Sequence, residues 1–383
     1  MKTIFFFFIF FVFSLHFLSA QEFPGLLDPP DILQPVPPEY RDDKRLWQGI
    51  PNITVAPKGR LWAAWYSGGS HEGTHDNCVF LVTSNDTGKT WTVPLLAIDM
   101  PGPVRVVDPA LWTDPEGKVW FFWTQLVVGI ESSAGTWYMT TDTPDREDAV
   151  WSVPKRICDG LKSTKSIVDS KNRWIHPVVL KNDGYVYPGT IFEPGTHFVV
   201  SENKGKTFQS IGHVTVSRKD ADHDETNIIE KKDGSFWALL RTKYGIAESF
   251  STDGCKTWTE PKPSKILNTT SRFFVRRLKS GNLLFVKNGN MSERIGRTHL
   301  QAFLSDDDGK TWKGGLMLDE RQVSYPDGDQ ADDGTIFVIY DHERNNAREI
   351  LLARFTEEDV LNGKIVSDRS ALRLLINKAT GKK

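Results

Sequence analysis

This chain of 383 residues has few cysteines, a small net charge and few long apolar runs. Only three cysteines occur, Cys78, Cys158 and Cys255, so at most one intramolecular disulfide can form and a disulfide scaffold is excluded. Their wide spacing also argues against a zinc knuckle. The formal net charge of −2 provides no basic surface for nucleic acid or for an anionic membrane, so neither partner is expected.

The longest apolar run covers residues 4–18 and follows a short positive start at Met1 and Lys2. Its about 15 residues fall short of the roughly 20 that a helix needs to span a bilayer, so no membrane anchor is expected. A polar residue follows Ser19 and Ala20, which is typical of a secretory signal peptide. The sequence therefore predicts a signal peptide over residues 1–20 and a secreted or periplasmic protein.

Proline is concentrated just after this segment, with six prolines between residues 22 and 39. Such a composition favours an extended chain, so residues 21–44 are predicted to form a proline-rich leader. The remainder, residues 45–375, is predicted to be a single domain, because a repeat architecture can hold a chain of this length together.

An eight-residue string recurs along the chain with the pattern Ser-x-Asp/Asn-x-Gly-x-Thr-aromatic. The four copies are "SNDTGKTW" from residue 84, "SENKGKTF" from 201, "STDGCKTW" from 251, where Cys255 takes the glycine position, and "SDDDGKTW" from 305. A longer relative, "TTDTPDREDAVW", begins at residue 140. These starts are fifty to sixty residues apart, a period typical of propeller blades rather than of helical solenoids.

A second series supports the same architecture. Six times a glycine opens a short run of apolar and aromatic residues, which is typical of a strand after a tight turn. The runs are "GRLWAAWYSG" from residue 59, "GKVWFFWTQ" from 117, "GYVYPGTIF" from 184, "GSFWALLRT" from 234, "GNLLFVKNG" from 281 and "GTIFVIYDH" from 334. No long stretch of the chain has apolar residues at helical spacing. Because six strand runs imply six blades, the sequence predicts an all-β, six-bladed β-propeller.

The aspartates of the repeated string are predicted to be structural. In a tight turn an aspartate can accept backbone N–H bonds, glycine tolerates positive φ, and the final aromatic ring can be buried between sheets. A set that recurs once per blade indicates a folding element, so Asp86, Asp253 and Asp307 are not expected to be catalytic.

These strings resemble the Asp-box of the sialidase superfamily, whose members are six-bladed propellers. Further motifs of that family stand in the same order here. Glu225 in "HDETNIIE" precedes a run that ends at Arg241, which resembles the catalytic glutamate and the second arginine of the family triad. Arg297 stands eight residues before an Asp-box serine, like the third arginine. Tyr325 stands just before the last glycine-led run, where the family carries its tyrosine nucleophile.

This resemblance implies a sialidase-like exo-glycoside hydrolase that cleaves a terminal acidic sugar, sialic acid or a related ulosonic acid, from a glycan. Tyr325 is then the nucleophile and Glu225 its base, so the two side chains are expected within hydrogen-bonding reach of each other, at about 3 Å. The reaction proceeds with retention of configuration. Arg241 and Arg297 are expected to bind the substrate carboxylate as bidentate forks. No cofactor or metal is implied.

The chain departs from the family at the first arginine of the triad. The family has an Arg-Ile-Pro string where this chain has Gly49 before Ile50 and Pro51. The missing charge could come from Arg105, or from Arg272 or Arg276, but each of these could equally form a surface ion pair. Asp108 stands where the family has an asparagine near the pocket, and both departures favour an altered substrate.

The general acid is also displaced. In "YSGGSHEGTHDNCVF" both Glu72 and Asp76 are candidates to protonate the leaving oxygen, and Glu72 is favoured. His71 and His75 in the same loop raise the possibility of a metal site, but a loop lacks the rigid helical face that makes histidines four residues apart informative, so no metal is predicted.

Two other functions fit the same sequence. The chain could be a hydrolase or lyase for another polysaccharide sugar, such as one containing uronate or rhamnose. It could also be a non-catalytic carbohydrate-binding propeller that keeps the Asp-boxes for folding alone. The conserved order of the tyrosine, the glutamate and two arginines favours an enzyme, whereas the missing arginine favours a different substrate or the loss of activity.

Overall fold

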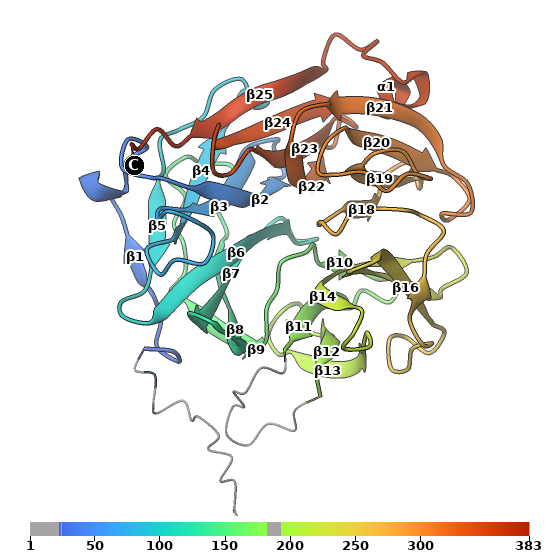
Figure 1. Ribbon diagram of the computed structural model, residues 1–383, viewed down its shortest axis with the longest axis horizontal. Coiled ribbons are helices and arrows are strands. Elements are labelled where there is room, and N and C mark those ends of the chain that lie inside the picture. Colours follow the sequence, from blue (N-terminus) through green and yellow to red (C-terminus); the bar gives the residue numbers. More distant parts are fainter. Residues whose placement is uncertain (1–22, 24, 182–192, 383) are drawn as a thin grey trace, which may run out of the picture.

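The computed structural model describes residues 23, 25–181 and 193–382, and it confirms the predicted all-β, six-bladed propeller (Figure 1). Within these residues the strands form six antiparallel sheets arranged in a ring around a central axis. Each sheet takes its four main strands from one continuous stretch of chain. The signal peptide predicted over residues 1–20 lies outside the described residues.

The innermost strand of each blade lies along the axis. These strands are β2 (Gln48–Val55), β6 (Val104–Thr113), β10 (Ile167–Val168), β14 (Ala221–Glu230), β18 (Phe274–Arg277) and β22 (Val323–Gln330). The second strands are β3 (Leu61–Ser67), β7 (Val119–Val127), β11 (Trp174–Leu180), β15 (Phe236–Thr242), β19 (Leu283–Asn288) and β23 (Ile336–His342).

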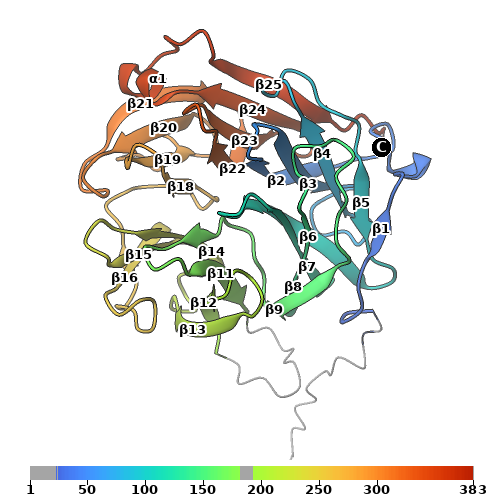
Figure 2. The same ribbon diagram turned by 180° about the vertical axis from the view of Figure 1, so that it is seen from behind.

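The third and fourth strands lie toward the outside of the ring, and Figure 2 shows the ring from behind. The third strands are β4 (Cys78–Ser84), β8 (Ile130–Thr141), β12 (Gly195–Ser201), β16 (Gly245–Ser251), β20 (Leu300–Ser305) and β24 (Glu349–Phe355). The fourth strands are β5 (Leu96–Asp99), β9 (Lys155–Asp159), β13 (Gln209–Val214), β17 (Lys262–Pro263), β21 (Lys313–Asp319) and β25 (Ala371–Lys378).

The glycine-led runs form the second strand of five blades, β3, β7, β15, β19 and β23, rather than the innermost strand. Tyr325 therefore lies within the innermost strand β22, and the run that follows it is β23. In blade 3 the second strand is β11 (Trp174–Leu180). The run that was predicted from residue 184 covers residues 184–192, which all lie outside the described residues.

The hydrophobic core is divided among the six interfaces between neighbouring blades. Successive side chains of a strand point to opposite faces of its sheet, so one strand serves two interfaces. On β15, Ala238 and Leu240 pack toward blade 3, whereas Trp237 and Leu239 pack toward blade 5. This explains why the second strands read as continuous apolar runs, since both of their faces are buried.

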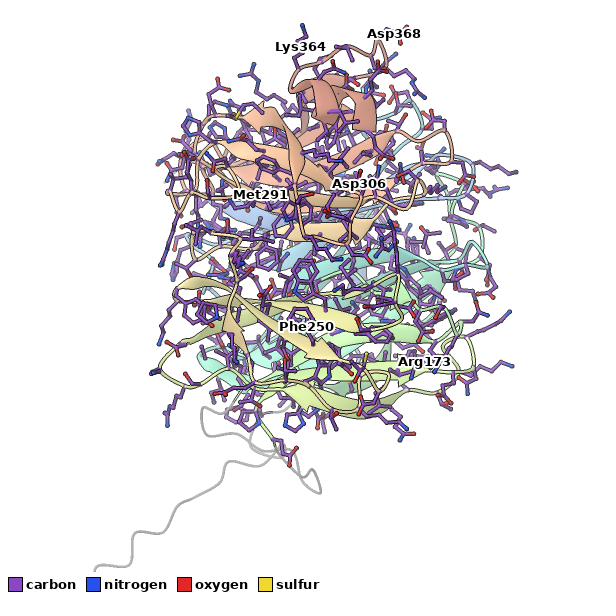
Figure 3. All side chains as sticks on the ribbon, turned by 90° about the vertical axis from the view of Figure 1, so that its right-hand side faces the viewer. Arg173, Phe250, Met291, Asp306, Lys364 and Asp368 are labelled. Atoms are coloured by element: carbon purple, nitrogen blue, oxygen red, sulfur yellow. The ribbon has the colours of Figure 1, made fainter. Side chains whose placement is uncertain are left out.

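The Asp-box turns join the third strand of a blade to the fourth, and their structural role is confirmed. Asp307 of blade 5 accepts hydrogen bonds from the Thr311 N–H (2.9 Å) and the Thr311 hydroxyl (2.6 Å), and Asp86 makes the same bonds to Thr90. Neighbouring Asp306, labelled in Figure 3, pairs with Lys313. The aromatic residue that ends the turn packs on the next sheet, as where the Trp258 and Phe198 rings stack at 4.3 Å.

Among the described residues, the ring closes between blade 6 and blade 1 without a strand that is shared between the two ends of the chain. Carboxylates of blade 6 accept hydrogen bonds from the backbone of β2 instead. Asp327 accepts from the Ile53 N–H (3.0 Å), and Asp329 accepts from the Val55 N–H (3.0 Å). Because both steps are two residues along each strand, β2 and β22 run in the same direction along the axis.

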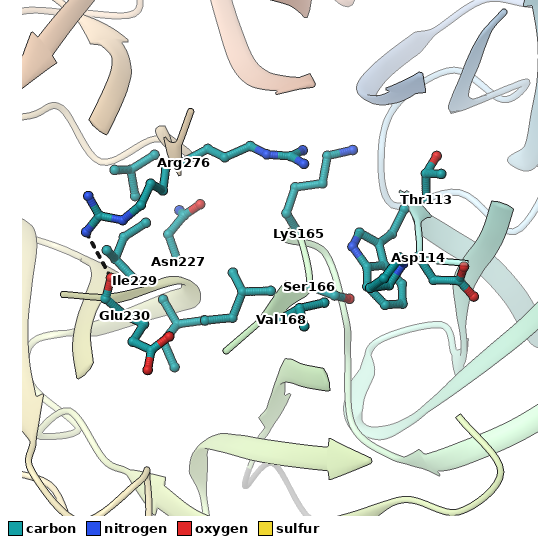
Figure 4. Close-up of a pocket in the computed structure, with 15 residues that line it drawn as sticks. Thr113, Asp114, Lys165, Ser166, Val168, Asn227, Ile229, Glu230 and Arg276 are labelled. Carbon is teal, nitrogen blue, oxygen red and sulfur yellow. Dashed lines mark hydrogen bonds between the residues drawn. The ribbon is translucent and has the colours of Figure 1, made fainter. Parts of the chain in front are cut away.

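Lys165, in the segment before β10, fills the middle of the central channel. Its ammonium group donates to the carbonyls of Ile53 and Leu111 and forms an ion pair with Asp327 at 3.0 Å. A cavity of about 340 Å³ lies beside it, lined by the carboxyl ends of β6, β14 and β18 (Figure 4). Lys165 and Arg276 both reach into this cavity.

The remaining elements lie at the edge of the ring. β1 (Asp31–Leu33), within the predicted proline-rich leader, pairs with β5, so this part of the leader adds a fifth strand to blade 1. The short helices are η2 (Pro38–Tyr40) and α1 (Glu357–Asn362), and Thr356 caps the start of α1. Within the described residues, none of the helices has the length and apolar character needed to cross a membrane.

Candidate active site

β-bulges interrupt the innermost strands of blades 1, 2, 4 and 6 near their amino-terminal ends. In three of these bulges a residue other than glycine has positive φ: Ile50 (57°), Asp108 (49°) and Tyr325 (55°). This conformation is strained for side chains with a Cβ, and a bulge re-aims the side chain it carries. The local strain thus marks one end of the channel, opposite to the cavity beside Lys165 and Arg276.

Tyr325 is buried at the centre of this end, with only 3% of its surface exposed. Four guanidinium groups surround its ring, at distances to the ring centroid of 3.9 Å for Arg344, 4.8 Å for Arg272, 5.4 Å for Arg297 and 5.7 Å for Arg241. Arg241 Nη1 also donates a hydrogen bond to the Tyr325 hydroxyl at 2.6 Å. These guanidinium charges favour negative charge on the phenol oxygen, and the carboxylates that pair with them oppose it.

Glu225 is held between two of these arginines. Its Oε2 accepts from Arg241 Nη1 at 2.9 Å, and its Oε1 accepts from Arg272 Nη2 at 3.0 Å. Burial alone would raise the pKa of Glu225, but the charges of Arg272 and Arg241 lower it to about 2. Glu225 is therefore a carboxylate in the free protein.

Tyr325 and Glu225 meet at the same nitrogen, Arg241 Nη1, rather than through a bond of their own. The sequence led us to expect a direct hydrogen bond between them, and the structure places Arg241 as the bridge instead. Burial and the Glu225 charge raise the pKa of the Tyr325 hydroxyl, an effect partly offset by Arg241 and Arg344. The phenol is therefore protonated at neutral pH.

A second carboxylate fixes the other side of Arg241. Asp222 Oδ2 lies 3.0 Å from Arg241 Nε, and Asp222 also accepts bonds from His223 Nδ1 (2.9 Å) and the Thr270 hydroxyl. Burial would raise the pKa of Asp222, but the bonds from His223 and Thr270 and the Arg241 charge hold it well below its usual value. The Arg241 fork thus has a fixed orientation between two carboxylates.

Asp108 also faces this group of charges. Its Oδ1 lies 3.7 Å from Arg272 Nη2, and its side chain is 14% exposed. Burial raises the pKa of Asp108 to about 6, an effect that Arg272 opposes and that Glu225 and Glu72 reinforce. Asp108 is therefore a carboxyl group that changes its charge just below neutral pH.

The structure separates the two candidates for the general acid. Glu72 accepts hydrogen bonds from the Tyr66 hydroxyl and from Arg344 Nη1, both at 3.1 Å, so it borders the Tyr325 pocket. Asp76 pairs with His75 at 2.8 Å, and both side chains are more than half exposed. Among the described residues, Asp76 makes no hydrogen bond or ion pair with the arginines around Tyr325.

The other arginines predicted from the sequence lie in three different places relative to this site. Arg297 contacts the Tyr325 ring and donates to the Thr270 carbonyl at 3.3 Å. Arg105 donates to the Glu72 backbone carbonyl at 2.5 Å, so it supports the loop that carries Glu72. Arg276 pairs with Asp329 at 2.7 Å at the opposite end of the channel, so it does not belong to this site.

Sequence reasoning missed Arg344, the guanidinium that lies nearest to the Tyr325 ring. Arg344 follows β23 and pairs with Asp341 (2.7 Å) and with Glu72 (3.1 Å). It belongs to no repeated string and reaches the site only because blade 6 closes against blade 1. Among the described residues, no group of three or more His, Cys, Asp or Glu side chains could hold a metal ion.

Comparison with known families agrees with this architecture. The profile of the BNR repeat-like domain matches residues 59–338, most of the chain. The chain belongs to this BNR repeat-like family. The match covers five Asp-box or related strings and extends past Tyr325 into β23.

Solved structures similar to this BNR repeat-like chain include two intramolecular trans-sialidases. The leech intramolecular trans-sialidase has 15% identity and a TM-score of 0.67, covering 85% of this chain and 70% of its own. The intramolecular trans-sialidase of Ruminococcus gnavus has 17% identity and a TM-score of 0.66, covering 84% of this chain and 97% of its own. A Dyadobacter fermentans protein of unknown function has 16% identity and a TM-score of 0.63, covering 83% and 95%.

At such low identity these likenesses show the shared fold alone. No protein with a curated description matches the chain in sequence.

Proposed function

We propose that the protein is an exo-acting glycoside hydrolase that removes a terminal acidic sugar, sialic acid or a related ulosonic acid, from a glycan. The observation that carries this proposal is the arrangement of Tyr325, whose hydroxyl is linked to Glu225 through Arg241 and whose ring is surrounded by guanidinium groups. The two intramolecular trans-sialidases among the similar structures add support. The predicted signal peptide favours export, where a glycan substrate is accessible.

The charge of the substrate explains why a tyrosine suits this position. A sialic acid carries a carboxylate on its anomeric carbon, so an anionic nucleophile would meet a like charge in a poorly solvated pocket. The Tyr325 phenol is neutral in the free protein. The arginines around it can bind the substrate carboxylate and also stabilise the phenolate as it develops.

The proposed reaction has two steps. First, the Tyr325 oxygen attacks the anomeric carbon, its proton passes to Glu225, and the bond to the leaving oxygen breaks as Glu72 protonates that oxygen. This produces a covalent tyrosyl glycoside and a shortened glycan. In the second step Glu72 accepts a proton from water, the water oxygen replaces the phenol oxygen on the anomeric carbon, and Tyr325 recovers its proton from Glu225, with net retention.

Glu225 is a weak base in the free protein, and in this scheme substrate binding makes it a stronger one. Its pKa of about 2 results from the charges of Arg272 and Arg241 acting against the effect of burial. A substrate carboxylate that shares Arg241 weakens this stabilisation of the Glu225 carboxylate, so its affinity for a proton increases when substrate is bound. Base strength and substrate binding are then coupled through one guanidinium.

The test is a screen of aryl glycosides of sialic acid, glucuronic acid and neutral sugars with the wild-type protein and the Tyr325→Phe variant. We expect sialoside turnover that falls at least about 100-fold in the variant, because the covalent step is lost. A matched control, Tyr138→Phe, changes a tyrosine of β8 that stacks on Trp120 and should leave turnover unchanged.

Other outcomes of the screen favour the other functions. Turnover of glucuronides or of neutral sugars alone, still dependent on Tyr325, favours a hydrolase for another polysaccharide. The absence of turnover for every glycoside, together with binding of the free sugars, favours a non-catalytic carbohydrate-binding propeller.

A further inference from the structure

Gly49 of blade 1 and Arg344 of blade 6 meet where the ring closes, and the Arg344 side chain fills the space beside Gly49. A Cβ placed on Gly49 would lie 2.8 Å from Cδ and Nε of Arg344 and 2.9 Å from its Cγ. Such contacts are shorter than real Cβ atoms show, so the Arg344 side chain lies where a side chain of residue 49 would be. The position of Arg344 over the Tyr325 ring therefore depends on a glycine in blade 1.

Arg344 is held firmly in this place. Its side chain is only 9% exposed; Nε pairs with Asp341 and Nη1 pairs with Glu72. Asp341 also accepts the Ile50 N–H at 2.9 Å, so the same carboxylate fixes the arginine and the bulge beside Gly49. A shift of Arg344 to make room for a Cβ would break these bonds.

One nitrogen of Arg344 remains available. Nη2 is buried and has no hydrogen-bond partner among the described residues, and the same is true of Nη1 of Arg272 on the other side of Tyr325. An unpaired buried donor is costly, so these nitrogens point to a ligand that accepts hydrogen bonds. A cavity of about 140 Å³ lies beside Arg344, and Arg297, Ser324, Asp341 and Glu343 contribute to its wall.

The charges around this cavity indicate which anion it would accept. Arg297 and Arg344 contribute two positive charges, and Asp341 and Glu343 contribute two negative charges. A monoanion can accept a hydrogen bond from Arg344 Nη2 without a large excess of negative charge, whereas a phosphate dianion would be repelled by both carboxylates. A carboxylate is also planar and fits a guanidinium fork.

We infer that Gly49 and Arg344 form a single binding unit for the carboxylate of a monosaccharide acid, at the cavity between Arg344 and Arg297. Gly49 supplies the space and Arg344 supplies the charge. This inference rests on the proposed function, because it assigns the acidic group of the proposed substrate to a place in the site.

The test measures binding rather than turnover. In the Tyr325→Phe background, isothermal titration calorimetry compares N-acetylneuraminate and glucuronate with their uncharged methyl esters. We expect at least one acid to bind about tenfold more tightly than its ester. Arg344→Gln should weaken binding of that acid about 10- to 100-fold and leave binding of the ester nearly unchanged, because a charged hydrogen bond is lost.

Two further variants keep the test decisive. Gly49→Ala should weaken acid binding by a similar factor, since its Cβ displaces Arg344. Arg344→Lys retains the charge without the fork, so its loss should be smaller than that of Arg344→Gln, and it serves if Arg344→Gln does not fold. The matched control is Arg276→Gln, which removes an ion-paired arginine at the opposite end of the channel and should not affect acid binding.

Several results would overturn the inference. These are equal binding of acids and esters, no binding of either acid, acid binding that Arg344→Gln and Gly49→Ala leave intact, or stronger competition by inorganic phosphate than by the acids. Failure of the proposed function looks different. Acid-selective binding that depends on Arg344, without turnover by the wild-type protein, refutes the hydrolase and supports the inference. Tyr325-dependent turnover of sialosides, with acid binding that Arg344→Gln and Gly49→Ala leave intact, supports the hydrolase and refutes the inference.

Discussion

Asp108 is a buried carboxyl group in a pocket that is proposed to receive an anion. Burial raises its pKa to about 6 despite the opposing charge of Arg272, so the group is mostly neutral below pH 6 and ionised above it. An ionised Asp108 repels a carboxylate ligand. We therefore predict that the affinity for an acidic sugar falls about tenfold, roughly 1.4 kcal/mol, as pH rises through about 6.

Asp108→Asn provides the control for this prediction, because an asparagine does not ionise. Calorimetric titration of the same acidic sugar between pH 5 and 8 should show a nearly constant affinity in the variant. The methyl ester of the sugar should show little pH dependence in either protein. An unchanged pH dependence in Asp108→Asn would assign the titration to another group, such as His223.

Glu225 links the site to acid stability. Its pKa is lowered from 4.5 to about 2 because the charges of Arg272 and Arg241 outweigh the effect of burial. A carboxyl with a depressed pKa contributes stability that is fully present above about pH 4.5 and is lost as pH falls toward 2. We predict that this group alone reduces the free energy of unfolding by up to about 3 kcal/mol over that range.

Urea unfolding at a series of pH values checks this prediction. Glu225→Gln cannot ionise, so its stability should fall less between pH 4.5 and 2 than that of the wild type. Glu230→Gln lies on the same strand, β14, away from Arg241 and Arg272, and should retain the wild-type dependence. Parallel curves for the wild type and Glu225→Gln would show that the two arginines do not stabilise the Glu225 charge.

Most of the candidate site could be predicted residue by residue, but its completion could not. Tyr325, Glu225, Arg241 and Arg297 stand beside recognisable strings, and the structure brings them together. Arg344 has no such string. The only sign of it in the sequence was the glycine at position 49. A glycine leaves space for another side chain, but which side chain fills that space is decided by the closure of the ring and not by a local sequence pattern.

At the scale of the element, the Asp-box turns differ in one position that can be tested. Blade 3 has Asn203 where blades 1, 4 and 5 have aspartate, and its amide Nδ2 donates to the Thr207 hydroxyl at 2.7 Å. In blade 1 the Thr90 hydroxyl donates to the Asp86 carboxylate at 2.6 Å instead. A hydrogen bond to an ionised acceptor is stronger than one between neutral groups.

We therefore predict opposite effects of exchanging the two residue types. Asn203→Asp should raise the free energy of unfolding by about 0.5 kcal/mol, and Asp86→Asn should lower it by about the same amount. Thermal and urea unfolding measure both changes, and neither variant should alter glycoside turnover. Effects of the same sign in both turns would contradict the assignment of this stabilisation to the charge.

The blades themselves were predictable wherever a turn carried its expected glycine. Five second strands follow a glycine with positive φ, such as Gly117 (86°) before β7 and Gly281 (89°) before β19. In blade 3 the corresponding turn before β11 uses Asn172 with φ of 60°. Asparagine can adopt this conformation but is not its usual marker, so no glycine in the sequence marks the start of β11.

At the scale of the whole molecule, the ring is held closed by polar groups near its axis as well as by its six apolar interfaces. Lys165 of blade 3 donates to Ile53 of blade 1 and Leu111 of blade 2, and it pairs with Asp327 of blade 6 at 3.0 Å. Burial lowers the pKa of Lys165 and raises that of Asp327, and each charge partly offsets the shift of the other. Four blades thus share one buried ion pair.

Removal of either partner of the Lys165–Asp327 ion pair should destabilise the propeller strongly. Removal of both partners should cost less than the sum of the two single losses. Lys165→Met and Asp327→Asn should each cost about 3–5 kcal/mol, because each leaves a buried charge or its acceptors unpaired. In the double variant the two losses should be less than additive by about 1–3 kcal/mol, since neither charge remains. Urea unfolding of the four proteins measures this coupling.

Lys162→Met is the control: this buried lysine lies over the Phe122 ring at 5.0 Å and donates to a backbone carbonyl, so its loss should cost less. Strict additivity, or single losses below about 1 kcal/mol, would mean that the apolar interfaces alone keep the ring closed.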